Sequence, residues 1–145
     1  MNRVKLQVPE NKIKVIIIPV RITDINYGNH VGNDAFVSII HEARMQWLHQ
    51  YGYTELNIEG TGLIQADLIV EFKNESFYGD SIHVTIAVGE ISKVGFALYY
   101  QLDTVRNNEP ILLASAKTGM VCYDYHNKKI TGVTEKIKEI LIIKS

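Results

Sequence analysis

The chain lacks several of the residue patterns that most directly reveal a function. Its one cysteine, Cys122, cannot form an internal disulfide, so we expect a reducing, cytoplasmic compartment and an inert thiol. The five histidines are scattered, without paired Cys or His spacing, so neither a metal site nor a bound cofactor is expected. Lysine and arginine form no cluster and the formal net charge is -1, so nucleic acid is not an expected partner.

Long apolar runs are also missing. Residues 15–18 form an apolar run that is far too short to cross a bilayer, and the first residues lack the apolar segment of a signal peptide. The 145 residues are 46% hydrophobic and 21% charged, which suits one globular domain over residues 1–145. We therefore expect a soluble protein that does not associate with membranes.

One long helix is predicted early in the chain. Residues 12–23 are rich in isoleucine and valine and predict a strand, which Pro19 places at a sheet edge or at a bulge. Residues 35–51 then follow helical spacing, with Gly52 as the stop. Asn33 or Asp34 is the expected N-cap. The apolar positions of this helix recur every three or four residues, at Phe36, Ile40, Ala43 and Trp47.

Four strand-like runs follow the helix, at residues 62–73, 81–92, 95–106 and 111–125. Because short connections join antiparallel neighbours, we expect hairpins in chain order. Residues 134–143 predict a short C-terminal helix. A single long apolar helix needs a curved sheet to bury it, so the pattern predicts an α+β fold in which a five-stranded antiparallel sheet wraps the helix.

The loop before the long helix is the most polar part of this pattern. It reads Asp24-Ile-Asn-Tyr-Gly-Asn-His30-Val-Gly-Asn-Asp34. Backbone N–H groups around Gly32, Asn33 and Asp34 are free to receive a negative oxygen, and glycine would let a ligand approach the backbone closely. Such donors suit the oxyanion that forms during thioester hydrolysis. An ordinary helix cap explains the same residues equally well.

The loop and helix resemble the hot-dog acyl-CoA thioesterases of the 4-hydroxybenzoyl-CoA thioesterase-like family. The loop of that family is often Asp-x-Asp-x-x-Gly-His-Val-Asn-Asn, followed by a helix with Glu-Ala-Arg. The matching residues here are Asp24, His30, Val31, Asn33 and Glu42-Ala43-Arg44, and Phe77-Tyr-Gly-Asp80 is similar to the family's Gly-Asp turn. The resemblance implies a hot-dog fold, an acyl-CoA substrate, and a homodimer or tetramer with its active site at a dimer interface.

The chain departs from the family at its usual catalytic residue. The second loop Asp of the family falls on Asn26, which cannot accept a proton as a carboxylate does. Asn26 can orient water or the carbonyl, or it can satisfy the turn. His30 can act as a base near neutral pH, or bond a neighbouring carbonyl. Glu42 borders the apolar stripe and is the best remaining carboxylate, expected to be partly shielded; alternatively it pairs on the surface with Gln46 or Arg44.

Helix geometry limits how one chain can use these groups. Glu42 comes eight residues after Asp34, which is about 12 Å along the helix axis. One chain can hardly bring its helix N-terminus and its own Glu42 to the same thioester carbon. Two chains related by a two-fold axis can do so, because antiparallel helices place one chain's glutamate beside the other's N-terminus.

The sequence thus favours a thioesterase acting on acyl-CoA or, as a weaker option, on acyl-carrier protein. Its expected catalytic residues are Asn26, His30 and Glu42, with Gly32, Asn33 and Asp34 binding substrate, and coenzyme A entering only as part of the substrate. An acyl-CoA-binding hot-dog protein without turnover is the alternative, which Asn26 supports. A hydratase or dehydratase is a third possibility, but the proline- and glycine-rich loop expected around its histidine is absent.

Overall fold

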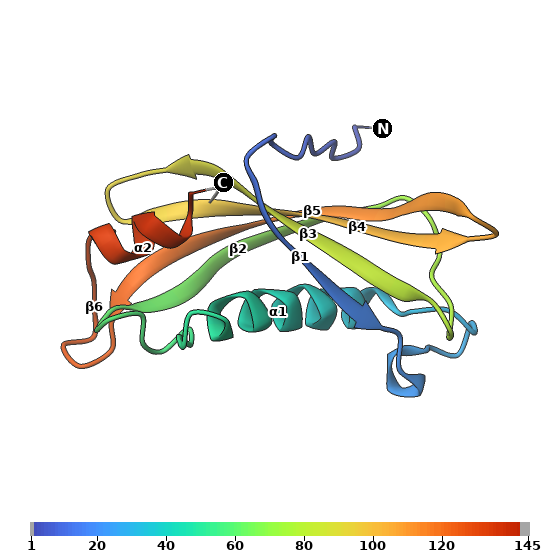
Figure 1. The fold of residues 1–145 in the computed structure, drawn as a ribbon, viewed down its shortest axis with the longest axis horizontal. Coiled ribbons are helices and arrows are strands. Elements are labelled where there is room, and N and C mark those ends of the chain that lie inside the picture. Colours follow the sequence, from blue (N-terminus) through green and yellow to red (C-terminus); the bar gives the residue numbers. More distant parts are fainter. Residues whose placement is uncertain (1, 143–145) are drawn as a thin grey trace.

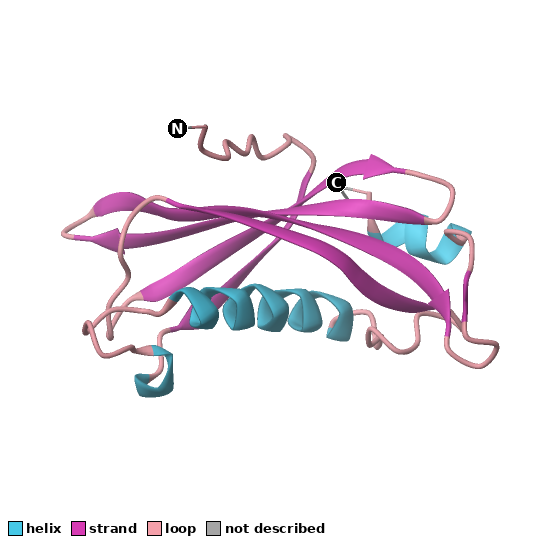
Figure 2. Cartoon of the chain, turned by 180° about the vertical axis from the view of Figure 1, so that it is seen from behind, coloured by secondary structure: helices cyan, strands magenta, loops and turns pink. Residues whose placement is uncertain are grey.

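The computed structural model describes residues 2–142, which form one antiparallel sheet with a long helix packed against one face (Figures 1 and 2). The helices are α1 (Asn33–His49), α2 (Glu135–Ile140) and the 3-10 turn η1 (Ile22–Asp24). The strands are β1 (Lys12–Pro19), β2 (Gly62–Phe72), β3 (Ser81–Ile91), β4 (Gly95–Arg106), β5 (Glu109–Asp124) and β6 (Lys129–Ile130). The predicted α+β architecture is confirmed. The sheet has a sixth strand because β6 pairs with the end of β5.

The strand order is β1-β3-β4-β5-β2, which differs from the expected chain of hairpins. Consecutive pairing holds for β3, β4 and β5, but β2 pairs with β5 instead of β3. Residues 73–80 carry the chain from one side of the sheet to the other. Eight extended residues reach roughly 26 Å, whereas three strand spacings need only about 14 Å. The connection was long enough to cross the sheet, so its length did not require a hairpin.

Helix α1 lies along the sheet because one of its faces is apolar. Phe36, Ile40, Ala43 and Trp47 are among its buried residues, as the spacing predicted. Each large side chain of this kind stabilises the fold by about 1.5–3 kcal/mol when buried. The helix is thereby fixed against the sheet, and its two ends have fixed positions.

The ends of α1 differ in how well they were predicted. Gly52 has the left-handed φ of +79° that a helix stop requires. The N-cap is Gly32, one residue before the expected Asn33 or Asp34, and no side chain caps the helix. Gly32 already has extended backbone, and its carbonyl accepts the first helical hydrogen bond, from Phe36 N. Asn33 is therefore the first residue of the helix itself.

The remaining segments close the ends and outer face of the sheet. Thr134 caps α2 by accepting a hydrogen bond from Ile137 N, and the expected end of this helix at residue 143 lies outside the described residues. The N-terminal segment runs over the sheet face opposite α1 (Figure 1), where Leu6 N donates to Glu71. No helix in the described part of the chain is long and apolar enough to span a membrane.

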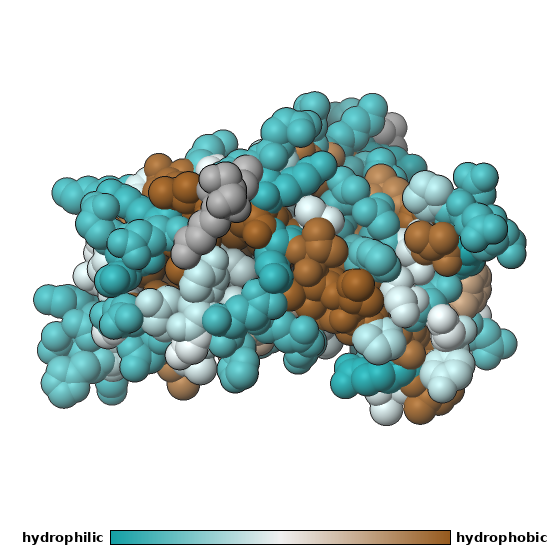
Figure 3. All heavy atoms as spheres, viewed as in Figure 1, coloured by the Kyte–Doolittle hydropathy of each residue, from teal (hydrophilic) through white to brown (hydrophobic). Residues whose placement is uncertain are grey.

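Strands β1 and β2 form the two edges of the sheet. Pro19 is the last residue of β1, so the expected edge position is confirmed. Apolar side chains gather on the surface along β1 (Figure 3), where Val15 and Ile17 are exposed. At the opposite edge, β2 is paired on one side only within the described residues, which leaves a strand of 11 residues open to a further strand.

An ion pair fixes the connection that crosses the sheet. Arg106, the last residue of β4, donates from Nη2 to Asp80 Oδ2 at 2.8 Å and from Nε to Asp80 Oδ1 at 3.2 Å. Ser76 Oγ and Phe77 N also donate to this carboxylate. Burial would raise the pKa of Asp80, but the hydrogen bonds from Arg106, Phe77 and Ser76 outweigh it and hold that pKa below its ordinary value.

The Asp80 carboxylate should therefore contribute stability that depends on pH. A depressed folded pKa stabilises the fold above the unfolded pKa of about 3.9, and this contribution is lost as pH falls through the folded value. We predict that Asp80→Asn lowers the free energy of unfolding at pH 7 by about 1.5–3 kcal/mol. In urea unfolding experiments, the difference in unfolding free energy between Asp80→Asn and wild type should shrink steadily below about pH 4.

A matched control is available on β4. Asp103 accepts one hydrogen bond, from Gln101, which an asparagine can also accept, so Asp103→Asn should cost no more than about 1 kcal/mol. If the free energies of unfolding of wild type and Asp80→Asn differ by a constant amount from pH 7 to pH 3, this explanation of the ion pair is contradicted.

Candidate functional site

The loop before α1 folds back on itself through backbone hydrogen bonds. Asn26 N donates to His30 O at 2.9 Å, and Asn29 N donates to Asn26 O at 3.1 Å. Asn29 has a left-handed φ of 65°, a conformation that glycine and asparagine tolerate best. Gly32 N then donates to Asp24 O. These bonds hold His30 and the start of α1 side by side.

Asn26 serves the loop and still has a free donor. Its Oδ1 accepts from Gly28 N at 2.8 Å and from His30 N at 3.4 Å, which is the turn role that asparagine fits. Its Nδ2 has no partner within the described residues. A Cβ built on Gly32 would lie 3.8 Å from that Nδ2 and 3.5 Å from Asn26 Cβ. The free amide N–H groups are thus next to the N-terminus of α1.

His30 is held at one ring nitrogen and open at the other. Its Nδ1 lies 3.2 Å from Val31 O, so this nitrogen carries the hydrogen of the neutral ring and donates it to the carbonyl. Nε2 is left to face Glu75, whose Oε1 lies 3.8 Å away. The expected bond to a neighbouring carbonyl is present, and it is the bond that aims the second nitrogen at Glu75.

The N-terminus of α1 offers three unpaired donors. The backbone N–H groups of Asn33, Asp34 and Ala35 precede the first helical hydrogen bond, and within residues 2–142 none of them has an acceptor. A Cβ on Gly32 would lie 2.6 Å from Asp34 Oδ1. The absence of that Cβ keeps the approach to these donors open.

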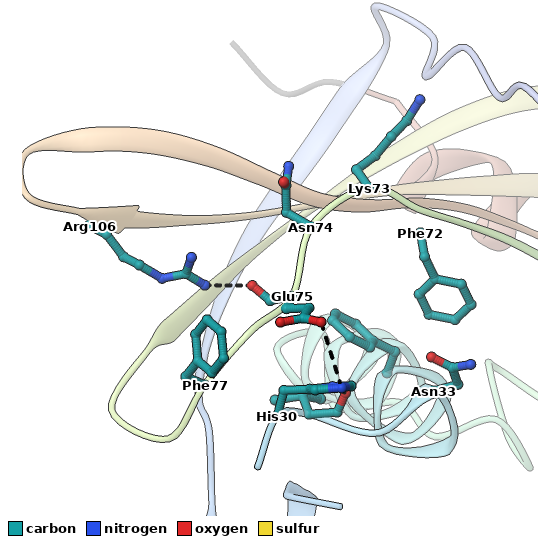
Figure 4. Close-up of a pocket in the computed structure, with 10 residues that line it drawn as sticks. His30, Asn33, Phe72, Lys73, Asn74, Glu75, Phe77 and Arg106 are labelled. Atoms are coloured by element: carbon teal, nitrogen blue, oxygen red, sulfur yellow. Dashed lines mark hydrogen bonds and ion pairs between the residues drawn. The ribbon is translucent and has the colours of Figure 1, made fainter. Parts of the chain in front are cut away.

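A pocket of about 470 Å³ opens at this end of the helix (Figure 4). Phe36 from α1 and Phe72 from β2 form part of its wall, with ring centroids 5.5 Å apart in an edge-to-face arrangement. Polar groups surround the rest. The lining residues are His30, Val31, Asn33, Phe36, Phe72, Lys73, Asn74, Glu75, Phe77 and Arg106. An apolar wall beside a few convergent polar groups is typical of a small-molecule site.

Glu42 lies away from this pocket. It is exposed, on the side of α1 turned away from the sheet, so the expected partial shielding is wrong for the single chain. Gln46 Nε2 donates to Glu42 Oε2 at 2.7 Å, which is the surface pairing considered for it. The two residues line a separate cleft of about 520 Å³. The structure therefore brings His30 and Asn33 into one pocket, with Asn26, Gly32 and Asp34 beside it, but not Glu42.

Arg44 belongs to a different, buried network. Its side chain is only 3% exposed, and its Nε lies 3.4 Å from Glu55 Oε2, so it makes a structural ion pair with Glu55. Nη1 donates to the hydroxyl of Tyr100, which lies 2.7 Å from Thr118 Oγ1. His41 Nε2 lies 2.7 Å from the other oxygen of Glu55. This pair could not be predicted from local sequence patterns, because His41 and Glu55 belong to different segments.

Several pocket residues were not predicted. Glu75 and Phe72 had no motif around them, and nothing in the sequence singled out Lys73 or Arg106. The turn ending at Asp80 was the one available sign, since it lies beside the pocket. Cys122 is buried, and burial raises the pKa of its thiol to about 11, so it is the inert residue expected.

Solved structures share this fold. The 1,4-dihydroxy-2-naphthoyl-CoA thioesterase from Synechocystis aligns with a TM-score of 0.76 and 21% identity, over 88% of this chain and 93% of that one. The dynemicin thioesterase aligns with a TM-score of 0.78 and 18% identity, over 88% of this chain and 93% of that one. A mutant 4-hydroxybenzoyl CoA thioesterase complexed with 4-hydroxybenzoyl CoA aligns with a TM-score of 0.78 and 14% identity, over 90% of this chain and 99% of that one. Likenesses at these identities establish the hot-dog fold. No curated protein matches the chain significantly.

The sequence itself establishes the family. The family profile described as the thioesterase-like superfamily matches residues 20–141. This range begins at the end of β1 and includes the polar loop, α1, the crossing connection and the rest of the sheet. The match covers well over half of the chain, so this protein belongs to the thioesterase-like superfamily.

Proposed function

We propose that the protein hydrolyses an acyl-CoA thioester to the free acid and coenzyme A. The observation that carries this proposal is the uncapped N-terminus of α1, where the free N–H groups of Asn33 and Asp34 lie beside Asn26 and His30 at a pocket with an aromatic wall. Membership of the thioesterase-like superfamily and similarity to folds of CoA thioesterases support it.

In this proposal the thioester carbonyl accepts hydrogen bonds at the helix N-terminus. The N–H groups of Asn33 and Asp34 hold the oxygen, and their hold strengthens as negative charge develops on it. Asn26 Nδ2 adds a side-chain donor beside them. Removing one such donor typically slows turnover by about a hundred- to a thousandfold. The acyl group lies against Phe36 and Phe72, and His30 lies at the reacting carbon.

The carboxylate that activates water is proposed to come from a second copy of the chain. Glu42 keeps Oε1 free as an acceptor, because Gln46 bonds only Oε2. The open edge of β2 can pair with its own copy about a two-fold axis, which would also set the two α1 helices antiparallel. A cleft of about 440 Å³ between α1 and β2, lined by apolar residues that include Val37 and Leu68, offers further surface for that contact.

Binding without turnover is the competing function. Asn26 stands where the family usually carries a catalytic Asp, and an amide cannot take a proton from water. If no other carboxylate reaches the substrate, the same pocket would hold an acyl-CoA and release it unchanged. The two functions differ in one observable, which is whether a free thiol appears.

Gly32→Ala tests the proposed approach to the helix N-terminus. The backbone of Gly32 has φ -71° and ψ 156°, which alanine adopts without strain. The new Cβ would meet the flexible tip of Asp34, which can move, but it would also fill the space between Asn26 and the helix. We predict a loss of kcat/KM of about tenfold or more, with the unfolding free energy changed by less than about 1 kcal/mol. Full activity in a stably folded variant would contradict the proposed binding mode.

Mixed dimers test whether two chains share one site. Asn26→Ala and Glu42→Ala should each lower thioester hydrolysis by about a hundredfold or more. A mixture that has exchanged subunits should recover about a quarter of wild-type activity, because half of its dimers contain one intact site. The measurement is thiol release before and after exchange, with the exchange itself verified by mass.

His41→Ala is the matched control for that experiment. His41 precedes Glu42 on α1 but is already bonded to Glu55. His41→Ala protomers should hydrolyse the thioester on their own, so their activity should not depend on complementation by Asn26→Ala protomers. Recovery with His41→Ala protomers but not with Glu42→Ala protomers would move the shared group to His41. No recovery in any mixture, despite verified exchange, would contradict a shared site.

A further inference from the structure

A second carboxylate lies within the same chain at the proposed site. Glu75 belongs to the connection between β2 and β3, and its Oε1 lies 3.8 Å from His30 Nε2 across the pocket that Asn33 also lines (Figure 4). This distance is longer than a direct hydrogen bond but is within the range of an ion pair.

The ring of His30 is oriented for this contact. Nδ1 is committed to Val31 O, so any proton that the ring gains or loses is carried by Nε2, the nitrogen that faces Glu75. The Glu75 carboxylate at 3.8 Å attracts an N–H at Nε2 by its charge, but it forms no direct hydrogen bond that would withhold the proton. A proton carried by Nε2 can therefore be donated to a group in the pocket.

The carboxylate of Glu75 is available for His30 because the pocket's cations are occupied elsewhere. Arg106 donates to both oxygens of Asp80, and it reaches Glu75 only at the backbone carbonyl, at 2.7 Å. Lys73 Nζ donates to Glu71 at 2.8 Å. Among the described residues, His30 is the one charged or titratable partner of the Glu75 carboxylate.

The backbone around Glu75 is fixed from two sides. Arg106 holds the Glu75 carbonyl, and Val31 N donates to the carbonyl of the next residue, Ser76, at 2.8 Å. Ser76 is completely buried. The segment that carries Glu75 is therefore joined to the segment that carries His30, and these bonds hold the backbones of the two segments next to each other.

We propose that Glu75 is a positioning residue that holds His30 as the proton donor to the leaving sulfur. The step rests on the proposed hydrolysis. Water adds to the thioester carbon and loses a proton to the partner's Glu42, which forms the C–O bond and the oxyanion. The oxyanion then collapses, the C–S bond breaks with its electron pair on sulfur, and sulfur takes the Nε2 proton of His30. Free acid and thiol leave, and exchange with solvent returns both side chains to their starting states.

The leaving thiol provides a test that a merely structural role would not pass. An alkylthiolate, such as that of coenzyme A or N-acetylcysteamine, benefits from protonation as it leaves, whereas a thiophenolate is a much weaker base and needs none. The experiment measures kcat and KM for the N-acetylcysteamine and thiophenol esters of benzoic and octanoic acids. Glu75→Gln should lower kcat for the alkylthiol ester by about tenfold or more, and for the thiophenol ester by less than about twofold, with KM little changed.

Two further variants separate this role from others. Glu90→Gln removes an exposed carboxylate at the far end of β3 and should leave both esters unaffected. His30→Gln should show the same dependence on the leaving thiol, and adding Glu75→Gln to it should cause little further loss, because both changes remove one function. Glu75 is 63% exposed on its side chain, so its replacement should change the unfolding free energy by less than about 0.5 kcal/mol.

The outcomes distinguish the failure of this proposal from the failure of the function. Equal losses on the two kinds of ester in Glu75→Gln, or losses that add to those of His30→Gln, would overturn the role of Glu75 while leaving the hydrolysis in place. Wild-type protein that cleaves neither kind of ester would overturn the proposed function and this inference together.

Discussion

The hydrogen bond from Val31 N to Ser76 O is the contact on which the site depends. It joins the loop before α1 to the connection between β2 and β3, two segments far apart in the sequence. On one side of it lie His30 and the free N–H groups of α1, and on the other lie Glu75 and the segment anchored by Arg106 and Asp80. Without this contact the pocket would have a helix end but no opposite wall.

The fold places that contact through two independent constraints. The apolar face of α1 fixes the helix on the sheet, and hence the position of Gly32 and the loop before it. The pairing of β2 with β5 then forces residues 73–80 to cross the end of the sheet, past the start of α1. An ordinary β2–β3 hairpin would have left this connection at one edge and the helix N-terminus open to solvent.

Much of this architecture could be predicted from the sequence because it follows from local periodicity. The spacing of Phe36, Ala43 and Trp47 predicted the helix and its buried face, and the short connections between the strands predicted the antiparallel sheet. The partner of β2 could not be predicted, since a connection of that length permits both arrangements. The N-cap shifted to Gly32 because backbone conformation decided it, not the capping strength of the side chains.

The candidate site was predictable only where a motif marked it. His30 and Asn33 line the pocket, as their places in the loop suggested. Glu75 was missed because it enters through a tertiary contact that local patterns do not encode. Glu42 was expected to be shielded from its place next to the apolar stripe, but it lies just beyond the boundary of that stripe and is exposed. Its proposed role therefore depends on a second chain.

The central claim is that this pocket breaks a thioester and does not merely bind it. The most direct measurement exposes the wild-type protein to acetyl-, octanoyl-, palmitoyl- and benzoyl-CoA, and records free-thiol release beside the thermal shift that each ligand produces. The account predicts release of coenzyme A from at least one of them at a rate that falls in Gly32→Ala. Thermal stabilisation by acyl-CoA with no thiol released from any of them would contradict it.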